Sequence, residues 1–197
     1  MILREGSQPD CRKPLKQDNR ISERGTMDEP LKIYTFPDPI LKTKATPVEE
    51  IDDGLQRLID RMALTMYAAP GIGLAANQVG ETQRVVVYDV LSRDGKRSPS
   101  ILINPEIVMA EGNIVYEEAC LSVLDYSAEV ERAQRVLVRG VDRDGNPVRV
   151  EAEGLLAICL QHEIDHLNGV LYIDHISSLK RSLYKKKLRK MLKIGRL

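Results

Sequence analysis

The chain has 197 residues, which is enough for one domain with short flanking segments. Its 29 basic and 29 acidic residues give a formal net charge of zero, so the composition predicts no general binding to polyanions. Three widely spaced cysteines do not form a disulfide framework and suit a reducing compartment, and an apolar content of 43% is ordinary for a globular protein.

Residues 1–26 are polar, carry charges of both signs and lack the apolar core of a signal peptide. We therefore expect them to be a disordered N-terminal extension. Residues 36–41 contain two prolines, which favour an extended lead-in segment over a helix. Residues 63–80 are uncharged, but Pro70 and several glycines would break a spanning helix, so no membrane segment is predicted.

Residues 52–68 have apolar side chains at helical spacing, which predicts a helix with one buried face that ends at Pro70 and Gly71. Asp144-Gly145 predicts a hairpin turn, Asp94-Gly95 another turn, and a second helix is expected to start near Gly154. Strands are predicted at 84–90, 101–103, 106–110, 113–118, 128–132, 135–142 and 147–152, and residues 170–173 are strand-like.

Residues 180–197 contain nine basic and no acidic residues, with leucines at partly amphipathic spacing. This pattern predicts a basic C-terminal helix or tail. A solvated terminal helix accounts for it most simply. The functional alternative is contact with ribosomal RNA or another acidic surface.

Residues 161–169 read Gln-His-Glu-Ile-Asp-His-Leu-Asn-Gly and contain an H-E-x-x-H motif. On a helix, His162 and His166 lie one turn apart on the same face, so both imidazoles can reach one cation. Glu163 lies about 100° round from His162, where it can take a proton from a metal-bound water. The apolar residues around the motif argue against a chance match on a solvated helix, because buried imidazoles and carboxylates need partners.

The third metal ligand is expected from upstream of the motif. The downstream ligands of zinc peptidases are missing, because Tyr172 stands where one pattern has His and no Glu follows His166. Cys159 lies roughly 7 Å along the helix axis from the midpoint of the histidines, which is too far for its short side chain. Cys120 is therefore the predicted third ligand, and an open fourth position would mark a catalytic site.

Three segments resemble the motifs of one family, the peptide deformylases. Gly71–Gln78 resembles G-x-G-L-A-A-x-Q, Glu118–Ser122 resembles E-G-C-L-S, and Gln161–Gly169 matches Q-H-E-x-D-H-L-x-G, in this order. The resemblance implies that residues 27–179 are a peptide deformylase-like catalytic domain. It also implies an α+β fold, with antiparallel β-sheets packed around a central metal-binding helix, an N-terminal helix and a C-terminal helix.

The same resemblance implies hydrolytic removal of the formyl group from the N-terminal formyl-methionine of nascent polypeptides in the bacterial cytoplasm. The expected protein is a monomer with one divalent metal ion, typically Fe2+, for which Zn2+ or Ni2+ can substitute. A metal-bound water would attack the formyl carbon. The basic C-terminus would contact the ribosome.

The resemblance also implies roles for individual residues. Cys120, His162 and His166 would hold the metal, and Glu163 would act as general base and then acid. Gln78 and the backbone N–H of Leu121 would stabilise the oxyanion. The residues expected to bind substrate are Ile72, Gly73, Ala119, Leu155, Ile158 and Cys159, with Gly73 admitting an extended substrate backbone and the apolar side chains forming the methionine pocket.

Two positions depart from the family pattern. Ala119 replaces a glycine, which would cost about 1–2 kcal/mol and could displace Cys120 if the position requires a positive φ, but little if φ is negative. Leu124 replaces a proline that many members have, which predicts a looser loop behind the metal. These departures keep open the alternative of a weakly active or inactive paralogue that binds peptide N-termini or ribosomes. A metallopeptidase is disfavoured by Tyr172.

Overall fold

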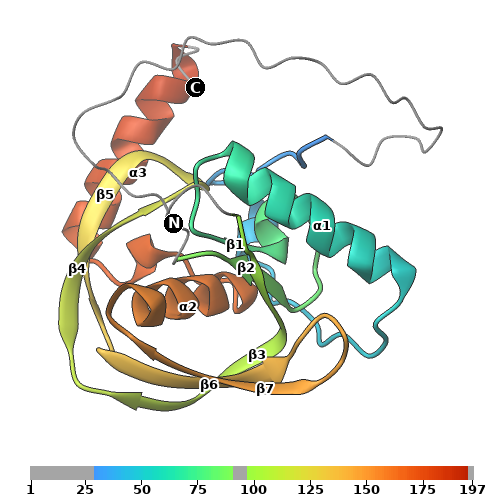
Figure 1. The fold of residues 1–197 in the computed structure, drawn as a ribbon. Helices are drawn as coiled ribbons and strands as arrows, with labels where there is room; N and C mark the ends of the chain where they lie inside the picture. The colour runs from blue at the N-terminus through green and yellow to red at the C-terminus, as the bar shows by residue number, and fades with distance from the viewer. Residues whose placement is uncertain (1–28, 91–96, 195–197) are drawn as a thin grey trace, which may run out of the picture.

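The computed structural model describes residues 29–90 and 97–194. The expected disordered segment 1–26 and the expected turn at Asp94-Gly95 lie outside these residues. Figure 1 shows helix α2 (Gly154–Leu167) at the centre, surrounded by β-strands, with helices α1 (Asp53–Ala68) and α3 (Ser178–Lys193) on the outside. The predicted α+β fold, with antiparallel sheets around a central helix and a helix towards each end, is confirmed.

Helix α1 begins as its sequence predicts and covers one face of the sheet. Its cap is Asp52, whose carboxylate accepts a hydrogen bond of 2.8 Å from the Leu55 backbone N–H. The predicted apolar face is buried against strands β1 (Gly73–Ala75) and β2 (Val85–Tyr88), and its members are Leu55, Ile59, Met62 and Met66. The helix ends at Ala68, shortly before the segment that enters the candidate site.

The larger sheet has five antiparallel strands in the order β1-β2-β3-β6-β7. Its remaining strands are β3 (Ser100–Glu111), β6 (Arg135–Val141) and β7 (Pro147–Glu153). The prediction of separate strands at 101–103 and 106–110 is wrong, because both belong to β3. Pairing with β6 shifts register between Ile103 and Glu106, where Asn104 has a φ of 53° and bonds through its side chain to both backbone groups of Val48.

The second sheet pairs β4 (Ile114–Cys120) with β5 (Val123–Arg132) through a tight turn. Both strands run further toward this turn than predicted. Leu124 therefore lies in β5, and the expected looser loop at this position is wrong. The Leu124 carbonyl accepts a hydrogen bond of 3.3 Å from the Tyr184 hydroxyl, which ties the strand to α3.

Two predicted extended segments instead contain short 3-10 helices. Pro39–Lys42 forms one because Asp38 caps it, accepting a hydrogen bond of 3.0 Å from the Ile40 N–H, and because proline suits a first helical position. Tyr172–Asp174 forms the other, in which the Asp174 carboxylate accepts a hydrogen bond of 2.9 Å from the Leu171 N–H. The strand-like pattern of 170–173 reflects burial rather than sheet pairing.

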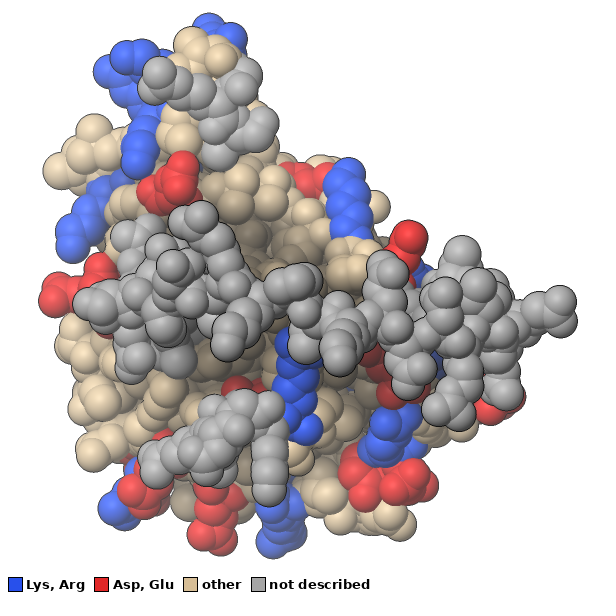
Figure 2. Space-filling view, turned by 45° about the horizontal axis from the view of Figure 1, so that its top comes forward, with Lys and Arg blue, Asp and Glu red and all other residues tan. Residues whose placement is uncertain are grey.

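Helix α3 packs on the core through two residues and leaves its charges in solvent. Tyr184 and Leu188 are buried in a cluster that also contains Leu41, Cys120 and Ile173. Figure 2 shows Lys and Arg side chains along the outer side of this helix. The domain boundary expected at residue 179 stays a prediction. Among residues 29–90 and 97–194, no helix is both long and apolar enough to cross a membrane.

Candidate metal centre

The structure brings the three predicted metal ligands together. Cys120 comes from the end of β4, while His162 and His166 come from one face of α2. One ligand atom of each side chain lies within 4.8 Å of the others, and all three residues are buried. Cys159 stays outside this cluster, because its Sγ faces the Ile72 carbonyl at 3.6 Å.

The atoms that meet in the cluster suit a cation. His162 Nε2 is buried and has no hydrogen-bond partner among the described residues, and His166 Nε2 lies 3.2 Å from Cys120 Sγ. Nitrogen and sulfur donors of this kind are the ones that iron, zinc and nickel accept in proteins. The residues present therefore fit a transition-metal ion.

The electrostatics of the two histidines also favour a bound cation. Burial is the largest single influence on His162 and favours the neutral ring, but Cys120, Glu118 and Glu163 outweigh it and raise the pKa of His162 to about 9. Burial, together with the neighbouring charge on His162, lowers the pKa of His166 well below its usual value. The pair therefore accommodates one positive charge, which a metal ion would replace.

Glu118 is a site residue that the sequence reasoning missed. Its Oε2 lies 2.7 Å from His162 Nδ1, so the ring donates a hydrogen bond here and directs Nε2 into the cluster. Burial alone would raise the pKa of Glu118, but hydrogen bonds from His162 and Arg132 lower it to about 2. A signal was present, because residues 118 and 120 of one strand point to the same face.

Glu163 follows His162 on α2 and is fully buried. It lies beside Gly73 of β1. A Cβ atom on Gly73 would meet Glu163 Oε1 at 2.5 Å and Cys159 Sγ at 2.8 Å. The glycine therefore makes room for the predicted general base itself, whereas its expected role toward a substrate backbone stays a prediction.

Gln78 and Leu121 lie beside the cysteine ligand. The Gln78 Oε1 accepts a hydrogen bond of 2.8 Å from the Ala75 N–H, which fixes the direction of the amide. Its Nε2 donates to Ser122 Oγ at 3.1 Å and lies 3.7 Å from Cys120 Sγ. Leu121 follows Cys120 directly, at the turn between β4 and β5. Both expected oxyanion donors are thus close to the cluster.

The residues expected to bind the substrate fall into two groups. Ile72, Ile158 and Cys159 are buried in one apolar cluster, against which Leu155 packs partly exposed. Ala119 lies in β4 and does not have a positive φ, since only Asn104 and Asp125 do among the described residues other than glycine. Alanine is therefore unstrained at position 119, and the backbone gives no reason for Cys120 to be displaced.

Aromatic side chains connect the cluster with α3. The ring of Tyr172 lies against that of His162, with 6.0 Å between centroids, and Tyr126 stacks on Tyr172 at 6.4 Å. Tyr184 of α3 stacks on Tyr126 at 4.6 Å. Four rings thus run from the last helix to a metal ligand.

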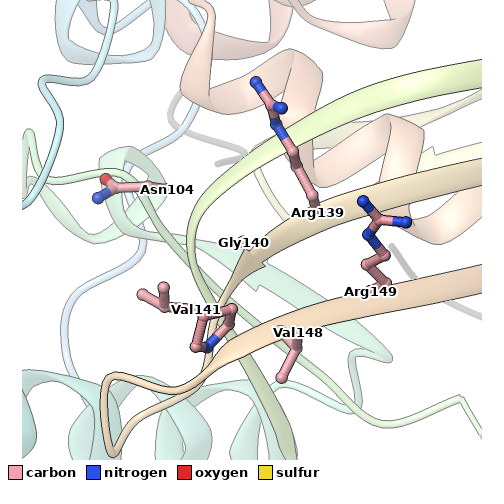
Figure 3. A pocket seen from close by; sticks show the side chains of 7 residues that line it. Asn104, Arg139, Gly140, Val141, Val148 and Arg149 are labelled. Atoms are coloured by element: carbon pink, nitrogen blue, oxygen red, sulfur yellow. The ribbon is translucent and has the colours of Figure 1, made fainter.

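A hollow of about 350 Å³ lies where β6 ends and β7 begins. Figure 3 shows Arg139 and Arg149 extending from these neighbouring strands, with Asn104 on the other side of the hollow. None of its lining residues belongs to the metal cluster. This hollow is therefore separate from the candidate active site.

Comparisons with known proteins agree on one family. A family model described as polypeptide deformylase matches residues 30–182. The chain is 56% identical to a peptide deformylase of Mesorhizobium japonicum over 162 residues, covering 82% of this chain and 92% of that protein. A similar relative from Rhizobium meliloti is 54% identical over 162 residues, covering 82% of this chain and 93% of that protein.

Solved structures give the same result. The crystal structure of a peptide deformylase from Legionella pneumophila superimposes with a TM-score of 0.79 and 45% identity, covering 85% of this chain and 98% of that chain. A class I type b peptide deformylase from Acinetobacter baumannii, solved with Met-Ala-Ser bound, has a TM-score of 0.72 and 33% identity, covering 76% and 100%. The similarity thus extends over most of each protein.

Proposed function

Because the chain belongs to the peptide deformylase family, and so is an enzyme that hydrolytically removes the N-formyl group from nascent polypeptides, we propose how its own residues carry out the reaction. The observation that supports the proposal is the gathering of Cys120, His162 and His166 within 4.8 Å, next to the buried Glu163. These three residues hold a divalent metal ion. The chain is an active enzyme rather than an inactive paralogue, because every ligand and the acid/base residue are present.

The metal we propose is Fe2+, for which Zn2+ or Ni2+ can substitute, and the thiolate–imidazole donor set supports a transition-metal ion of this group. When bound, such an ion supplies a Lewis acid that polarises the formyl carbonyl and acidifies a water molecule. Glu118 keeps His162 in the tautomer whose Nε2 is free to bind, because its carboxylate accepts a hydrogen bond from the Nδ1–H group.

Glu163 moves the proton. Its carboxylate takes a proton from the water whose oxygen adds to the formyl carbon. It then gives the proton to the amine nitrogen as the C–N bond breaks, so that formate and a free N-terminus leave. Burial of Glu163 beside Gly73 supports this role, because it holds the carboxylate in one place.

Two N–H groups stabilise the negative charge that develops on the formyl oxygen. They are the Gln78 side-chain amide and the backbone N–H of Leu121. The support for Gln78 is its fixed amide, which is anchored at Oε1 by Ala75 and faces Cys120 through Nε2.

The substrate is a nascent chain that begins with formyl-methionine. Ile72, Leu155, Ile158 and Cys159 form the pocket for the methionine side chain, which their apolar character supports. Gly73 and Ala119, on strands β1 and β4, lie along the extended substrate backbone. The Met-Ala-Ser complex of the A. baumannii relative supports a peptide of this kind as the ligand.

The enzyme works as a cytoplasmic monomer, and α3 brings it to the ribosome. The support for the ribosome contact is the row of exposed cations on α3, which are Lys185, Lys186, Lys187, Arg189 and Lys190. Ribosomal RNA is a polyanion, and the remainder of the chain offsets this local charge, so contact would be confined to the helix. Residues 27–179 carry the catalytic residues.

The test is hydrolysis of formyl-Met-Ala-Ser by protein loaded anaerobically with Fe2+, followed by formate release. We expect turnover by the parent, and a fall of 10²–10⁴-fold in Glu163→Gln with the metal content unchanged. Asp53→Asn serves as a control for the same kind of charge loss on another helix. Undiminished turnover in Glu163→Gln would refute the role of Glu163.

A further inference from the structure

A line of charged side chains runs from the metal cluster to the protein surface. It begins with the His162–Glu118 hydrogen bond. Arg132 then donates to both carboxylate oxygens of Glu118, from Nε at 2.6 Å and from Nη2 at 3.1 Å. Arg132 also bonds to residues beyond Glu118, so the interaction is a network and not an isolated carboxylate–arginine pair.

The outer part of the line consists of Asp165 and His175. The remaining Arg132 nitrogen, Nη1, donates to Asp165 Oδ2 at 2.6 Å. His175 Nε2 lies 2.7 Å from the same oxygen and 3.5 Å from Arg132 Nη1. Exposure of the side chain rises outward along the line, from 0% at Glu118 and 5% at Arg132 to 22% at Asp165 and 37% at His175.

The line joins four separate parts of the fold. Glu118 lies in β4, Arg132 ends β5, Asp165 lies in α2 and His175 follows the 3-10 helix Tyr172–Asp174. The Arg132 guanidinium is planar and its donors are fixed relative to one another. A carboxylate bound on one side therefore sets the orientation in which the guanidinium meets the carboxylate on the other side. Asp165 therefore fixes the Arg132 guanidinium on its solvent side. The guanidinium in turn fixes the Glu118 carboxylate on its buried side.

This network also affects the orientation of the metal ligand His162. The Glu118 carboxylate orients the His162 ring, and such partners typically change metal affinity 10–100-fold when removed. We propose that Asp165 and His175 are positioning residues for the metal site, which act through Arg132 and Glu118 to hold the His162 ring toward the ion. This inference rests on the proposed metal ligands.

The test uses full-length protein loaded with Co2+, whose visible absorption reports the ligand geometry. The first readout is this spectrum, and the second is the rate at which excess chelator removes the ion. The variants are Asp165→Asn and His175→Leu. His175→Gln is the conservative variant, because its amide can still donate to Asp165. Glu106→Gln is the matched control, since it removes the carboxylate of an exposed pair with Arg139.

We expect Asp165→Asn and His175→Leu to lose Co2+ about 3–10-fold faster than the parent and to have altered spectra, a smaller effect than removal of a direct partner. His175→Gln and Glu106→Gln should resemble the parent. If Asp165→Asn does not fold, His175→Leu decides, because its site is the more exposed one. Parent-like spectra and rates in His175→Leu would overturn the inference.

The same experiment separates this inference from the metal site itself. A parent protein that binds no Co2+ through Cys120, His162 and His166 would refute the proposed ligands. A parent that binds Co2+ normally, with variants that release it equally slowly, would refute only the roles of Asp165 and His175.

Discussion

Gly73 lies so close to Glu163 that a Cβ atom at residue 73 would stand 2.5 Å from the carboxylate oxygen Oε1. Real Cβ atoms do not approach an oxygen this closely, so any side chain at residue 73 must move Glu163 or the strand. The same Cβ would also press on Cys159 Sγ at 2.8 Å. This glycine is thus required by two neighbours on α2.

We therefore predict that Gly73→Ala lowers kcat/KM for formyl-Met-Ala-Ser by 10²-fold or more, because the general base leaves its position. Overpacking should also reduce the free energy of unfolding by about 1–3 kcal/mol. Steady-state kinetics and urea unfolding measure the two effects. Gly54→Ala is the control, since the atoms nearest to a Cβ there belong to the exposed side chain of Asp52, the closest at 3.1 Å. Unchanged kinetics in Gly73→Ala would contradict the assignment of Glu163.

Glu118→Gln should weaken metal binding by about 10–100-fold, because a neutral amide orients His162 less strongly. It also removes one of the two anionic partners of buried Arg132 and leaves Asp165 as the other, which should destabilise the fold by up to about 3–5 kcal/mol. Chelator competition and denaturant unfolding measure these changes. Glu117→Gln is the matched control, because Glu117 is the exposed neighbour on the opposite face of β4. Equal metal affinity in the two variants would argue against the role of Glu118.

The same carboxylate predicts how the metal-free protein responds to acid. The pKa of Glu118 is lowered to about 2 in the folded state, so its contribution to stability is complete above its ordinary pKa of 4.5. That contribution, roughly 3 kcal/mol, is lost as the pH falls from about 4.5 to 2. We expect Glu118→Gln to lose less stability than the parent over this range. Parallel curves of unfolding free energy against pH would contradict the prediction.

Metal binding should depend on pH through His162. Its pKa is raised to about 9, so below that pH the metal-free site carries a proton that the cation must displace. We expect the affinity for Zn2+ to rise about tenfold per pH unit between pH 7 and 9 and to level off above. Competition with a chelator of known pH dependence measures this. An affinity that is constant from pH 7 to 9 would show that His162 is neutral without metal.

Helix α3 should have two distinct roles: its buried side packs on the core, and its exposed lysines contact the ribosome. Truncation after Leu179 removes the buried Tyr184 and Leu188, and we expect it to abolish turnover by destabilising the core. Truncation after Lys190 retains both residues and should preserve turnover of a small peptide. Lys186→Glu combined with Lys190→Glu should weaken co-sedimentation with ribosomes and leave peptide turnover unchanged. Full activity after truncation at Leu179 would show that the packing contributes little.

Local patterns in the sequence were sufficient for the elements that carry the chemistry. The apolar spacing of residues 52–68 predicts α1, and H-E-x-x-H predicts which face of α2 binds metal. Both signals depend only on residues a few positions apart, which helical geometry relates directly. The assignment of Cys120 needed elimination and resemblance, because no local rule connects a strand with a distant helix.

The remaining features depend on pairing between distant segments. The prediction had two strands at 101–103 and 106–110, with Asn104 and Pro105 between them. The chain continues as one strand since the Asn104 side chain bonds to Val48, 56 residues earlier. Likewise, nothing near Glu118 indicates that Arg132 is its partner, because that contact requires the register of β4 and β5.

The row of rings from Tyr184 to His162 also shows how the metal ligands depend on different helices. Tyr184 and Leu188 of α3 lie in the same buried cluster as Cys120, whereas His162 and His166 lie on α2. Local unfolding of α3 would therefore remove packing around the cysteine while the two histidines keep their helix. The metal centre thus has one ligand whose surroundings depend on α3 and two whose spacing depends on α2 alone.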